Sequence, residues 1–526
     1  MTSEERSLAA PGTPETIKAS ALPAGRPNRH AGLLVALATA VLCLPFLRSV
    51  WWVSDEGIWL HAAQRVIGGQ VLYRDFFEFY PPLGFLIVTG WTTLFGSSLL
   101  AARLLIVLVI ALTAWFTFSC CRIMSNRVGV SAILTLAWVI GSQGPWTQVN
   151  HQWLSSLFSV MALWAILSAE GKTGRLALAG LAASAATLVT THRGGLVALA
   201  GLAALLSRRS LKALLIYAAS GLALLAAVLA LLWWQGSIAT VFDQVILFPL
   251  HQNAAVMRVS FGAFVDQQTI FIVAIFPLAA CLLILGLWRH GPALLRRPHW
   301  GTAGLFALAG FLGCFPRPDA VHNSFAVVLG LPLLAALISL LWPAGRAKPI
   351  YWSLAGAILL IPAYPLVKAA LQAGKAQQVQ TRAGLISLVP KNGTADIMHR
   401  LESLPPGDSV FFYPYDPMLP YLTGRRHPAG IDILVPQYST AAQYLETCRQ
   451  VMREAKWVSF NLDVSRPAFY RAIFPAMSNP QPPETLAFEA ALREGFAEAA
   501  LDGHFQLLRR TRASTKLCRQ LETIAR

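Results

Sequence analysis

The stretch from Ser54 to Phe85 is rich in carboxylates, although the whole chain has only 25 acidic residues among 526. A carboxylate held at a membrane surface could take a proton from a hydroxyl group, a role that accelerates reactions by about 10² to 10⁴-fold. The alternative is that these acids belong to a solvated loop and cap helix ends. We predict Asp55 as the leading catalytic residue. Glu56 and Glu78 are second candidates, because neighbours on a helix point about 100° apart and Asp55 and Glu56 cannot both face one pocket.

Cationic side chains gather at two turns far away in the sequence. His192 and Arg193 lie between two apolar runs, and Arg317 and His322 lie between two later ones. Arg offers paired donors to phosphate oxygens, and His adds a hydrogen bond or a proton. We predict that these four residues line a cationic pocket that faces Asp55 and binds a phosphate group. The alternative is that the arginines reach the interface and bind ordinary lipid headgroups.

Further substrate contacts are predicted for Tyr73, Asp75 and Tyr80 of the first loop and for His151 of a later one. For His151, a role in capping a helix is the alternative. The seven cysteines form no CxxC pair, and most lie in or beside apolar runs. We therefore predict no metal site and no cofactor, and nothing in the sequence supports a divalent metal ion.

The elements that must position these residues are apolar helices. The chain is 55% hydrophobic and 13% charged, whereas soluble domains are about 25% charged. Apolar runs long enough to cross a ~30 Å hydrocarbon layer recur throughout, which predicts an α-helical polytopic membrane protein with about 11 spans and interfacial helices. The predicted spans lie near residues 31–50, 99–120, 128–143, 153–169, 176–191, 195–207, 213–235, 268–288, 301–315, 323–342 and 350–370.

The distribution of Lys and Arg predicts the orientation of the bundle. The net charge is +17, but the basic residues form short clusters between apolar runs, which argues against a nucleic-acid partner. With the N-terminus in the cytoplasm, all of these clusters fall in cytoplasmic loops and the C-terminus lies outside. This assignment requires the apolar stretch from Pro82 to Leu94 to lie at the outer interface instead of crossing. The clusters are Arg122/Arg127, Lys172/Arg175, Arg208/Arg209/Lys212, Arg289/Arg296/Arg297 and Arg346/Lys348.

Composition divides the chain into three regions. Residues 1–30 are predicted to be a disordered cytoplasmic tail, residues 31–371 a transmembrane domain with an outer loop at 51–98, and residues 372–526 a small extracytoplasmic α/β domain. In the last region we expect strands at 410–413, 457–462 and 505–508 and helices at 440–455 and 486–498. Thr440 and Gln443 predict a capping box. Cys448 and Cys518 could form a disulfide in an oxidising compartment, which the sequence leaves open.

The order of these motifs resembles that of GT-C-type glycosyltransferases, a group that includes protein O-mannosyltransferases and lipid A aminoarabinose transferases. The resemblance covers roughly residues 31–371. The chain departs from many relatives at Asn150-His151, where they carry a second acid. The matching motifs are Asp55-Glu56-Gly57, the stretch from Gly69 to Asp75, Pro81-Pro82-Leu83, Arg193-Gly194, and Arg317 with His322 and Pro332.

The resemblance implies a multi-pass enzyme of the cell membrane, surrounded by lipid, that uses a polyprenyl-phosphate sugar. A hexosyl or pentosyl group would pass to an extracytoplasmic glycan, lipid or protein. Asp55 would act as general base in an inverting displacement, with His192, Arg193, Arg317 and His322 at the donor phosphate. The competing interpretations are a transporter or flippase of lipid-linked saccharides, which would place ionisable groups near the bilayer midplane, and a polymerase or ligase with an oligosaccharide donor. Neither the sugar nor the acceptor can be read from the sequence.

Overall fold

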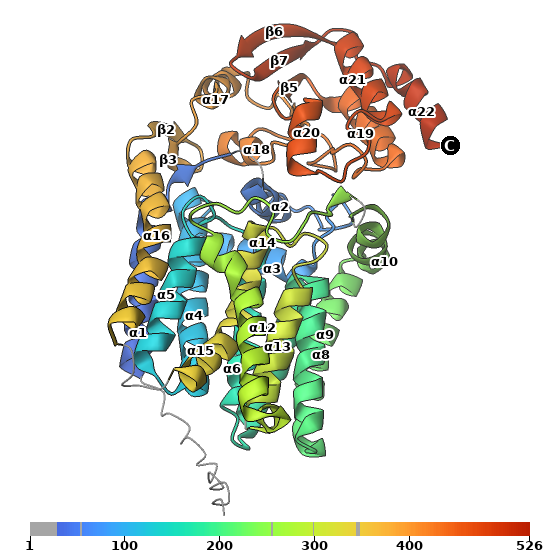
Figure 1. Cartoon of the computed structure of the whole chain (residues 1–526). Helices are drawn as coiled ribbons and strands as arrows, with labels where there is room; N and C mark the ends of the chain where they lie inside the picture. Colours follow the sequence, from blue (N-terminus) through green and yellow to red (C-terminus); the bar gives the residue numbers. More distant parts are fainter. Residues whose placement is uncertain (1–28, 53–54, 254–255, 298, 343–347) are drawn as a thin grey trace, which may run out of the picture.

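The computed structural model describes residues 29–52, 55–253, 256–297, 299–342 and 348–526. A bundle of long helices forms one part, and a mixed α/β region caps one end of this bundle (Figure 1). The predicted tail at residues 1–30 lies outside the described residues except for its last two, and so does Arg346.

A helix forms in every one of the predicted spans. Apolar side chains surround most of these helices, so burial against neighbours and against lipid stabilises them. The helices are α1 (Arg29–Cys43), α4 (Leu99–Ser125), α5 (Val128–Ser142), α6 (His151–Leu167), α7 (Thr173–Val189), α8 (Thr191–Ser207), α9 (Leu211–Trp234), α12 (Ile270–His290), α13 (Trp300–Leu312), α14 (Ala320–Ala326) with α15 (Leu331–Leu341), and α16 (Lys348–Gly374).

The number of membrane crossings remains a prediction. Among the described residues, four helices are long and apolar enough to cross a membrane, namely α4, α9, α12 and α16 from Trp352 onward. A fifth follows if α14 and α15, which meet at a bend of 66°, count as one broken span. Most of the other predicted spans are apolar helices of 10–17 residues, shorter than the ~20 residues that a straight crossing requires.

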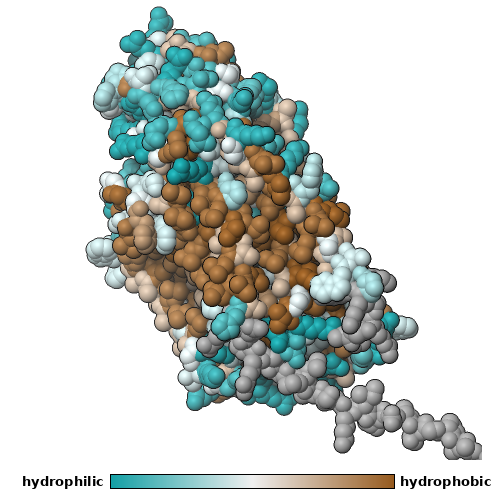
Figure 2. Space-filling view, turned by 90° about the vertical axis from the view of Figure 1, so that its left-hand side faces the viewer, coloured by the Kyte–Doolittle hydropathy of each residue, from teal (hydrophilic) through white to brown (hydrophobic). Residues whose placement is uncertain are grey.

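An apolar belt covers the face of the bundle that Figure 2 shows. Figure 2 shows hydrophobic side chains covering the middle of the molecule, with hydrophilic surfaces at both ends. Leu222 and Trp234 of α9 and Trp288 of α12 are among the large apolar side chains that remain exposed. Such a continuous surface requires an apolar solvent, so it identifies the bundle as a membrane domain.

Basic loops share one end of the bundle, opposite the C-terminal region (Figure 1). Arg127, between α4 and α5, donates to the carbonyl of Trp342 at the end of α15, at 2.7 Å. Arg208, after α8, reaches the carbonyl of Ile166 at the end of α6 and the hydroxyl of Thr302 in α13. Alternate loops therefore meet on one side, as the charge pattern predicts.

Two shorter helices lie at the other end. Helix α2 (Asp55–Ile67) sits between the bundle and the C-terminal region, and α3 (Pro82–Phe95) packs against it. A Cβ on Gly84 of α3 would lie 2.8 Å from the ring of Trp59 in α2, so glycine permits this close approach. The sequence prediction of a helix over 82–94 is thereby confirmed, whereas its interfacial position remains a prediction.

A small sheet joins the segment that follows the first helix of the membrane domain to the segment that follows its last helix. Strand β1 (Ser49–Val50) follows the first helix, and β2 (Gln377–Thr381) and β3 (Gly384–Leu388) follow the last one. The strand order is β1-β3-β2, with β1 parallel to β3 and β2 antiparallel to it. Backbone hydrogen bonds thus hold the exit of α1 beside the exit of α16.

The C-terminal region is built on a four-stranded sheet of order β4-β5-β7-β6. Strand β4 (Val410–Tyr413) is parallel to β5 (Trp457–Asn461), and β7 (Phe505–Arg510) is antiparallel to both β5 and β6 (Phe496–Asp502). The helices are α17 (Thr394–Ser403), α18 (Met418–Thr423), α19 (Ala441–Glu454), α20 (Pro467–Ile473), α21 (Pro483–Gly495) and α22 (Arg519–Ala525).

Most local predictions for this region are confirmed, and one is wrong. The Thr440 and Gln443 capping box starts α19, and a disulfide joins Cys448 of α19 to Cys518. The helix predicted over 486–498 instead ends at Gly495, and β6 begins at the next residue. The alanine-rich sequence there has high helix propensity, but pairing with β7 overrides it.

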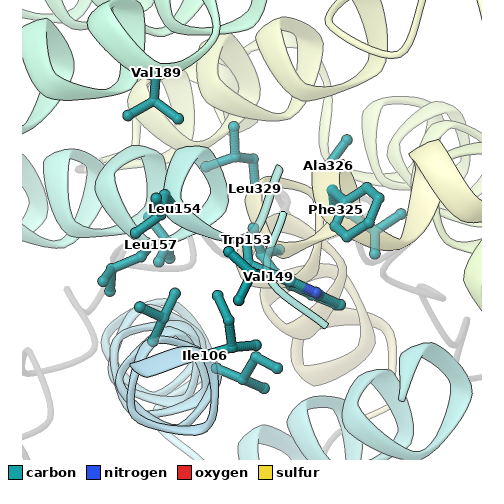
Figure 3. Close-up of a cluster of buried hydrophobic side chains, with 14 of the residues drawn as sticks. Ile106, Val149, Trp153, Leu154, Leu157, Val189, Phe325, Ala326 and Leu329 are labelled. Carbon is teal, nitrogen blue, oxygen red and sulfur yellow. The ribbon is translucent and has the colours of Figure 1, made fainter. Parts of the chain in front are cut away.

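Apolar packing beneath the C-terminal region fixes the helices that carry the polar residues described below. Figure 3 shows Trp153 of α6, Ile106 of α4, Val189 of α7 and Phe325 of α14 meeting in one cluster. The rings of Trp153 and Phe325 lie edge to face at 4.5 Å. Helices α6 and α14 are therefore held together close to His151 and His322.

Candidate active site

Asp55 is the first residue of α2, and its carboxylate meets a residue of the C-terminal region. The hydroxyl of Tyr415, which follows β4, donates a hydrogen bond to Oδ1 of Asp55. Burial raises the pKa of Asp55 above its ordinary value, while the Tyr415 hydrogen bond and the charges of His322 and Arg317 oppose that rise. Asp55 is thus a half-buried acid whose ionised form depends on three neighbours.

Glu56 has a different environment from Asp55. Its carboxylate forms a buried ion pair with Arg103 of α4 and also accepts the backbone N–H of Val149 at 2.8 Å. The same guanidinium donates to the carbonyls of Phe46, Ser49 and Thr147. Glu56 therefore anchors the start of α2 to the bundle.

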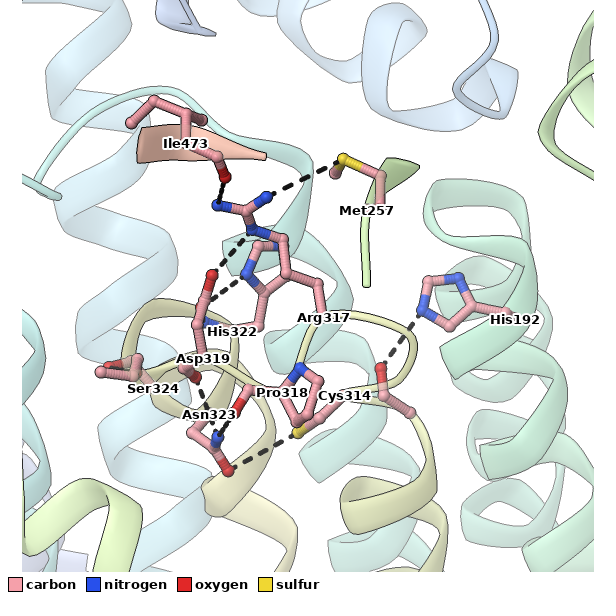
Figure 4. A network of polar contacts seen from close by, with 12 residues as sticks. His192, Met257, Cys314, Arg317, Pro318, Asp319, His322, Asn323, Ser324 and Ile473 are labelled. Carbon is pink, nitrogen blue, oxygen red and sulfur yellow. Dashed lines mark hydrogen bonds and ion pairs between the residues drawn. The ribbon is translucent and has the colours of Figure 1, made fainter. Parts of the chain in front are cut away.

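Arg317 and His322 lie on either side of Asp319 in the turn between α13 and α14 (Figure 4). Asp319 caps α14, and its carboxylate accepts from Arg317 Nε at 2.8 Å and from the His322 ring at 2.8 Å. Arg317 also donates to the carbonyl of Ile473 in α20 at 2.9 Å. Burial opposes ionisation of Asp319, but His322 and Arg317 outweigh it and hold the pKa of Asp319 below its ordinary value.

His192 and Arg193 begin α8, behind this turn. The ring of His192 bonds to the carbonyl of Gly313 at 3.2 Å, at the end of α13 (Figure 4). Arg193 is 1% exposed, and none of its guanidinium nitrogens has a hydrogen-bond partner in the part of the chain that the structure describes. A buried, unpaired guanidinium is costly, so Arg193 has donors ready for an anion.

A cavity of about 620 Å³ separates the bundle from the C-terminal region. It brings together five of the residues singled out by the sequence, namely Asp55, Tyr80, His151, Arg317 and His322. Four tryptophans also line it, at positions 51, 52, 59 and 146. One cavity therefore joins a carboxylate, cations and aromatic faces drawn from distant parts of the chain.

The other predicted residues lie outside the cavity lining. Tyr73 donates to the carbonyl of Tyr80 at 2.6 Å and so supports the loop that carries it. Asp75 forms a partly exposed ion pair with Arg74. Glu78 is buried, and burial together with the nearby charge of Asp432 raises its pKa well above the ordinary value. Glu56, His192 and Arg193 do not line the cavity either.

Sequence reasoning missed several polar lining residues, among them Asp319, Tyr415 and Asp416. Asp319 lies inside a motif that was recognised for its cations. Tyr415 and Asp416 directly follow a strand predicted at 410–413, and polar residues at a strand end were the available signal. Within the described ranges, no group of three or more His, Cys, Asp or Glu side chains is placed to hold a metal ion.

Residues 80–234 match the protein family described as dolichyl-phosphate-mannose-protein mannosyltransferase. The fold resembles the crystal structure of ArnT from Cupriavidus metallidurans in the apo state, at 13% identity and a TM-score of 0.58, over 92% of this chain and 98% of that one. Part of the chain thus matches this family, and nearly the whole chain has the fold of ArnT. The same ArnT bound to undecaprenyl phosphate gives 14% identity, a TM-score of 0.58 and the same coverage.

A further GT-C structure is similar over most of this chain. It is the arabinofuranosyltransferase AftD from Mycobacteria, at 14% identity and a TM-score of 0.50, over 93% of this chain and 40% of that one. None of the curated proteins matches the sequence significantly. The resemblance drawn from the motifs is thereby confirmed for the fold and, over residues 80–234, for the matching family.

Proposed function

We propose that this GT-C protein transfers one sugar from a polyprenyl-phosphate donor to a hydroxyl group of an extracytoplasmic acceptor. The supporting observation is that Asp55 shares a cavity with Arg317 and His322. A base and phosphate-binding cations are the two groups that such a transfer requires. The cavity lies at the end of the bundle opposite the basic loops, which is the extracytoplasmic side under the positive-inside rule.

The chemistry is a single displacement at the anomeric carbon. Asp55 takes the proton of the acceptor hydroxyl while the acceptor oxygen attacks the anomeric carbon. The bond between that carbon and the phosphate oxygen breaks, and the electron pair leaves with the phosphate. Arg317 and His322 stabilise the charge that develops on this leaving group. Attack from the opposite side of the ring inverts the anomeric configuration.

His322 is oriented for this task by its neighbour. Its Nδ1 donates to Asp319 Oδ1 at 2.8 Å, so Nε2 is left for a ligand in the cavity, and in the imidazolium form it donates to a phosphate oxygen. Arg193 lies behind the turn between α13 and α14 and adds a further positive charge. The apolar belt of the bundle offers the surface that a long prenyl chain needs, at about 0.8 kcal/mol for each buried CH₂ group.

One related structure bears on the donor, and the positions of the charged residues bear on the alternatives. The ArnT structure that contains undecaprenyl phosphate has the same fold over nearly the whole chain. A flippase or transporter would place its ionisable residues near the bilayer midplane, whereas Asp55, Arg317 and His322 gather at one end of the bundle. These two points favour a transferase with a lipid phosphate donor.

The test is transfer from a panel of radiolabelled polyprenyl-phosphate sugars by the purified protein. Asp55→Asn keeps the size of the side chain and removes the base, so we expect transfer to fall by at least about 10²-fold. Binding of undecaprenyl phosphate should persist, because the cations remain. Arg317→Ala should instead weaken that binding.

The matched control is Asp408→Asn, an acid of the C-terminal region that pairs with Lys456 and does not line the cavity. Its transfer rate should equal that of the unmodified protein. If Asp55→Asn transfers sugar as fast as the unmodified protein does, Asp55 is not the base. Failure to bind undecaprenyl phosphate, together with no transfer from any donor, would contradict the proposed function itself.

A further inference from the structure

Asp416 is a buried acid whose second oxygen has no partner. It lies between β4 and α18 and is 1% exposed, and it lines the cavity. Its Oδ1 accepts a hydrogen bond from Asn461 at 3.0 Å. Its Oδ2 is buried without a hydrogen-bond partner among the residues that the structure describes. Buried polar atoms in native proteins are nearly always paired, so this oxygen indicates a missing ligand.

The orientation of Asp416 is fixed by a chain of hydrogen bonds. The side-chain oxygen of Asn461 accepts the backbone N–H groups of Asp463 and Val464 at 3.1 and 3.2 Å. The amide nitrogen of Asn461 is therefore the atom that must face Asp416. Because this nitrogen is bound to Oδ1, the arrangement leaves Oδ2 for a group in the cavity.

The position of Asp416 relates it to the acceptor. Asp416 and Asp55 line the same cavity, and the residue before Asp416, Tyr415, donates its hydroxyl to Asp55. The cations that would hold the donor phosphate belong to the membrane domain, whereas Asp416 belongs to the C-terminal wall of the cavity. Aromatic side chains of the membrane-domain wall, such as Trp52 and Trp146 with ring centroids 5.0 Å apart, suit the C–H faces of a sugar ring.

The number of hydroxyl groups required narrows the class of acceptor. One hydroxyl must give its proton to Asp55, so a second one is needed to satisfy Asp416. A serine side chain or a simple lipid alcohol has only one. A saccharide carries several hydroxyl groups on a rigid framework, so one molecule can make both contacts.

We propose that Asp416 binds a second hydroxyl of the acceptor beside Asp55, so that the acceptor is a saccharide. This inference rests on the proposed function. Asp416 is thus a specificity-determining residue of the acceptor site. It does not take part in bond making or breaking.

The charge of Asp416 provides an independent readout. Burial raises the pKa of Asp416 to about 8, opposed by the hydrogen bond from Asn461. Near pH 7 the carboxyl is mostly protonated, so Oδ2 donates to a hydroxyl oxygen, and above pH 8 it can only accept. The other titratable or charged groups that line the cavity are Asp55, Tyr80, His151, Arg317, Asp319, His322, Tyr415, Asp463, Tyr470 and His504.

The experiment compares two classes of acceptor probe with any polyprenyl-phosphate sugar that the unmodified protein accepts. A panel of octyl glycosides presents neighbouring hydroxyls, whereas 1-octanol and a serine-containing peptide present one hydroxyl per side chain. We expect transfer to an octyl glycoside. Asp416→Leu should raise the acceptor KM at least about tenfold, with binding of undecaprenyl phosphate unchanged. Asp416→Asn retains a donor and should stay close to the unmodified protein at pH 7.

The other outcomes distinguish a failure of this inference from a failure of the proposed function. Transfer only to the peptide or to octanol, or an unchanged acceptor KM in Asp416→Leu, overturns the inference but leaves the proposed function intact. No transfer from any donor contradicts the proposed function instead. If Asp416→Leu does not fold, the acceptor KM is followed from pH 7 to 9. It should change in the unmodified protein and stay flat in Asp416→Asn, and parallel changes in both would overturn the inference.

Discussion

Two adjacent carboxylates, Asp55 and Glu56, have opposite environments because successive residues of a helix point about 100° apart. Asp55 faces the cavity and Glu56 faces Arg103. This divergence follows from helix geometry, so the sequence alone ranks Asp55 above Glu56 once a pocket is assumed. The identity of the partner on the other side, Arg103, could not be read from the sequence because it lies inside a predicted span.

Glu56→Gln should lower stability instead of removing a catalytic group. The substitution leaves a buried guanidinium without its anion, which costs about 3 to 5 kcal/mol. Thermal unfolding in detergent should show a clear decrease in Tm. Asp55→Asn serves as the comparison, because Asp55 has no ion-pair partner at hydrogen-bond distance among the described residues, and the Tm of this variant should change little. Equal Tm values for the two variants would contradict the structural role of Glu56.

Tyr415→Phe should change the pH dependence of transfer. The Tyr415 hydrogen bond lowers the pKa of Asp55 against the effect of burial, so its removal raises that pKa. Because the base must be ionised, the acidic limb of the kcat/KM profile should move to higher pH. Tyr421→Phe is the control, since that hydroxyl bonds to the carbonyl of Ser97 outside the cavity. If the acidic limb does not shift in Tyr415→Phe, Tyr415 does not set the pKa of the catalytic base.

The candidate site was predictable from the sequence only in part. Asp55, Arg317 and His322 stand out because charge is costly beside apolar spans, and the cavity brings all three together. Tyr415 and Asp416 carry no such signal, because Tyr and Asp are ordinary residues in a soluble domain. Their importance comes from the docking of that domain on α2, which no local pattern specifies.

At the scale of elements, α2 is the part of the membrane domain on which the C-terminal region docks. A Cβ on Gly57 would lie 2.1 Å from the backbone nitrogen of Met418, so α2 and α18 pack backbone to backbone. Next to this contact, His61 and Arg65 of α2 bind Asp432 at 2.6 and 3.1 Å. All three side chains are buried.

Asp432→Asn should loosen this docking contact. The change removes the anion from a buried cluster, and the uncompensated Arg65 costs about 3 to 5 kcal/mol. The expected result is a lower Tm and faster proteolysis of the C-terminal region. Glu454→Gln, which breaks the exposed pair with Arg426, should change Tm little, because exposed pairs contribute about 0 to 1 kcal/mol. Equal changes in Tm for the two variants would show that the buried cluster stabilises the protein no more than the exposed pair does.

At the scale of the whole molecule, hydropathy and charge predicted the helical bundle, its basic end and the α/β region. The lengths of the predicted spans were less accurate, because helices such as α5 and α13 are shorter than the hydrocarbon layer is thick. The strand β6 was missed because its alanine-rich sequence favours a helix. Long-range pairing decided its conformation.

The orientation can be tested with single cysteines and an impermeant maleimide. In sealed right-side-out vesicles, Glu494→Cys in α21 should be labelled at once, whereas Arg209→Cys in a basic loop should react only after permeabilisation. The native background is low among the described residues, because Cys281 is the one free cysteine that is exposed and it lies in apolar α12. The reverse pattern of labelling would invert the assignment and move the cavity to the cytoplasmic face.

The pairing of β1 with β3 has a consequence for biosynthesis. Ser49 lies beside Ser387 and Val50 beside Leu388, so the ladder joins residues that leave the ribosome far apart in time. Closing so long a loop is entropically slow. The nascent helices must therefore wait in the bilayer, with Asp55 uncovered, until the last of them has been inserted. The carboxylate meets its hydrogen-bond donor only after Tyr415 has been synthesised.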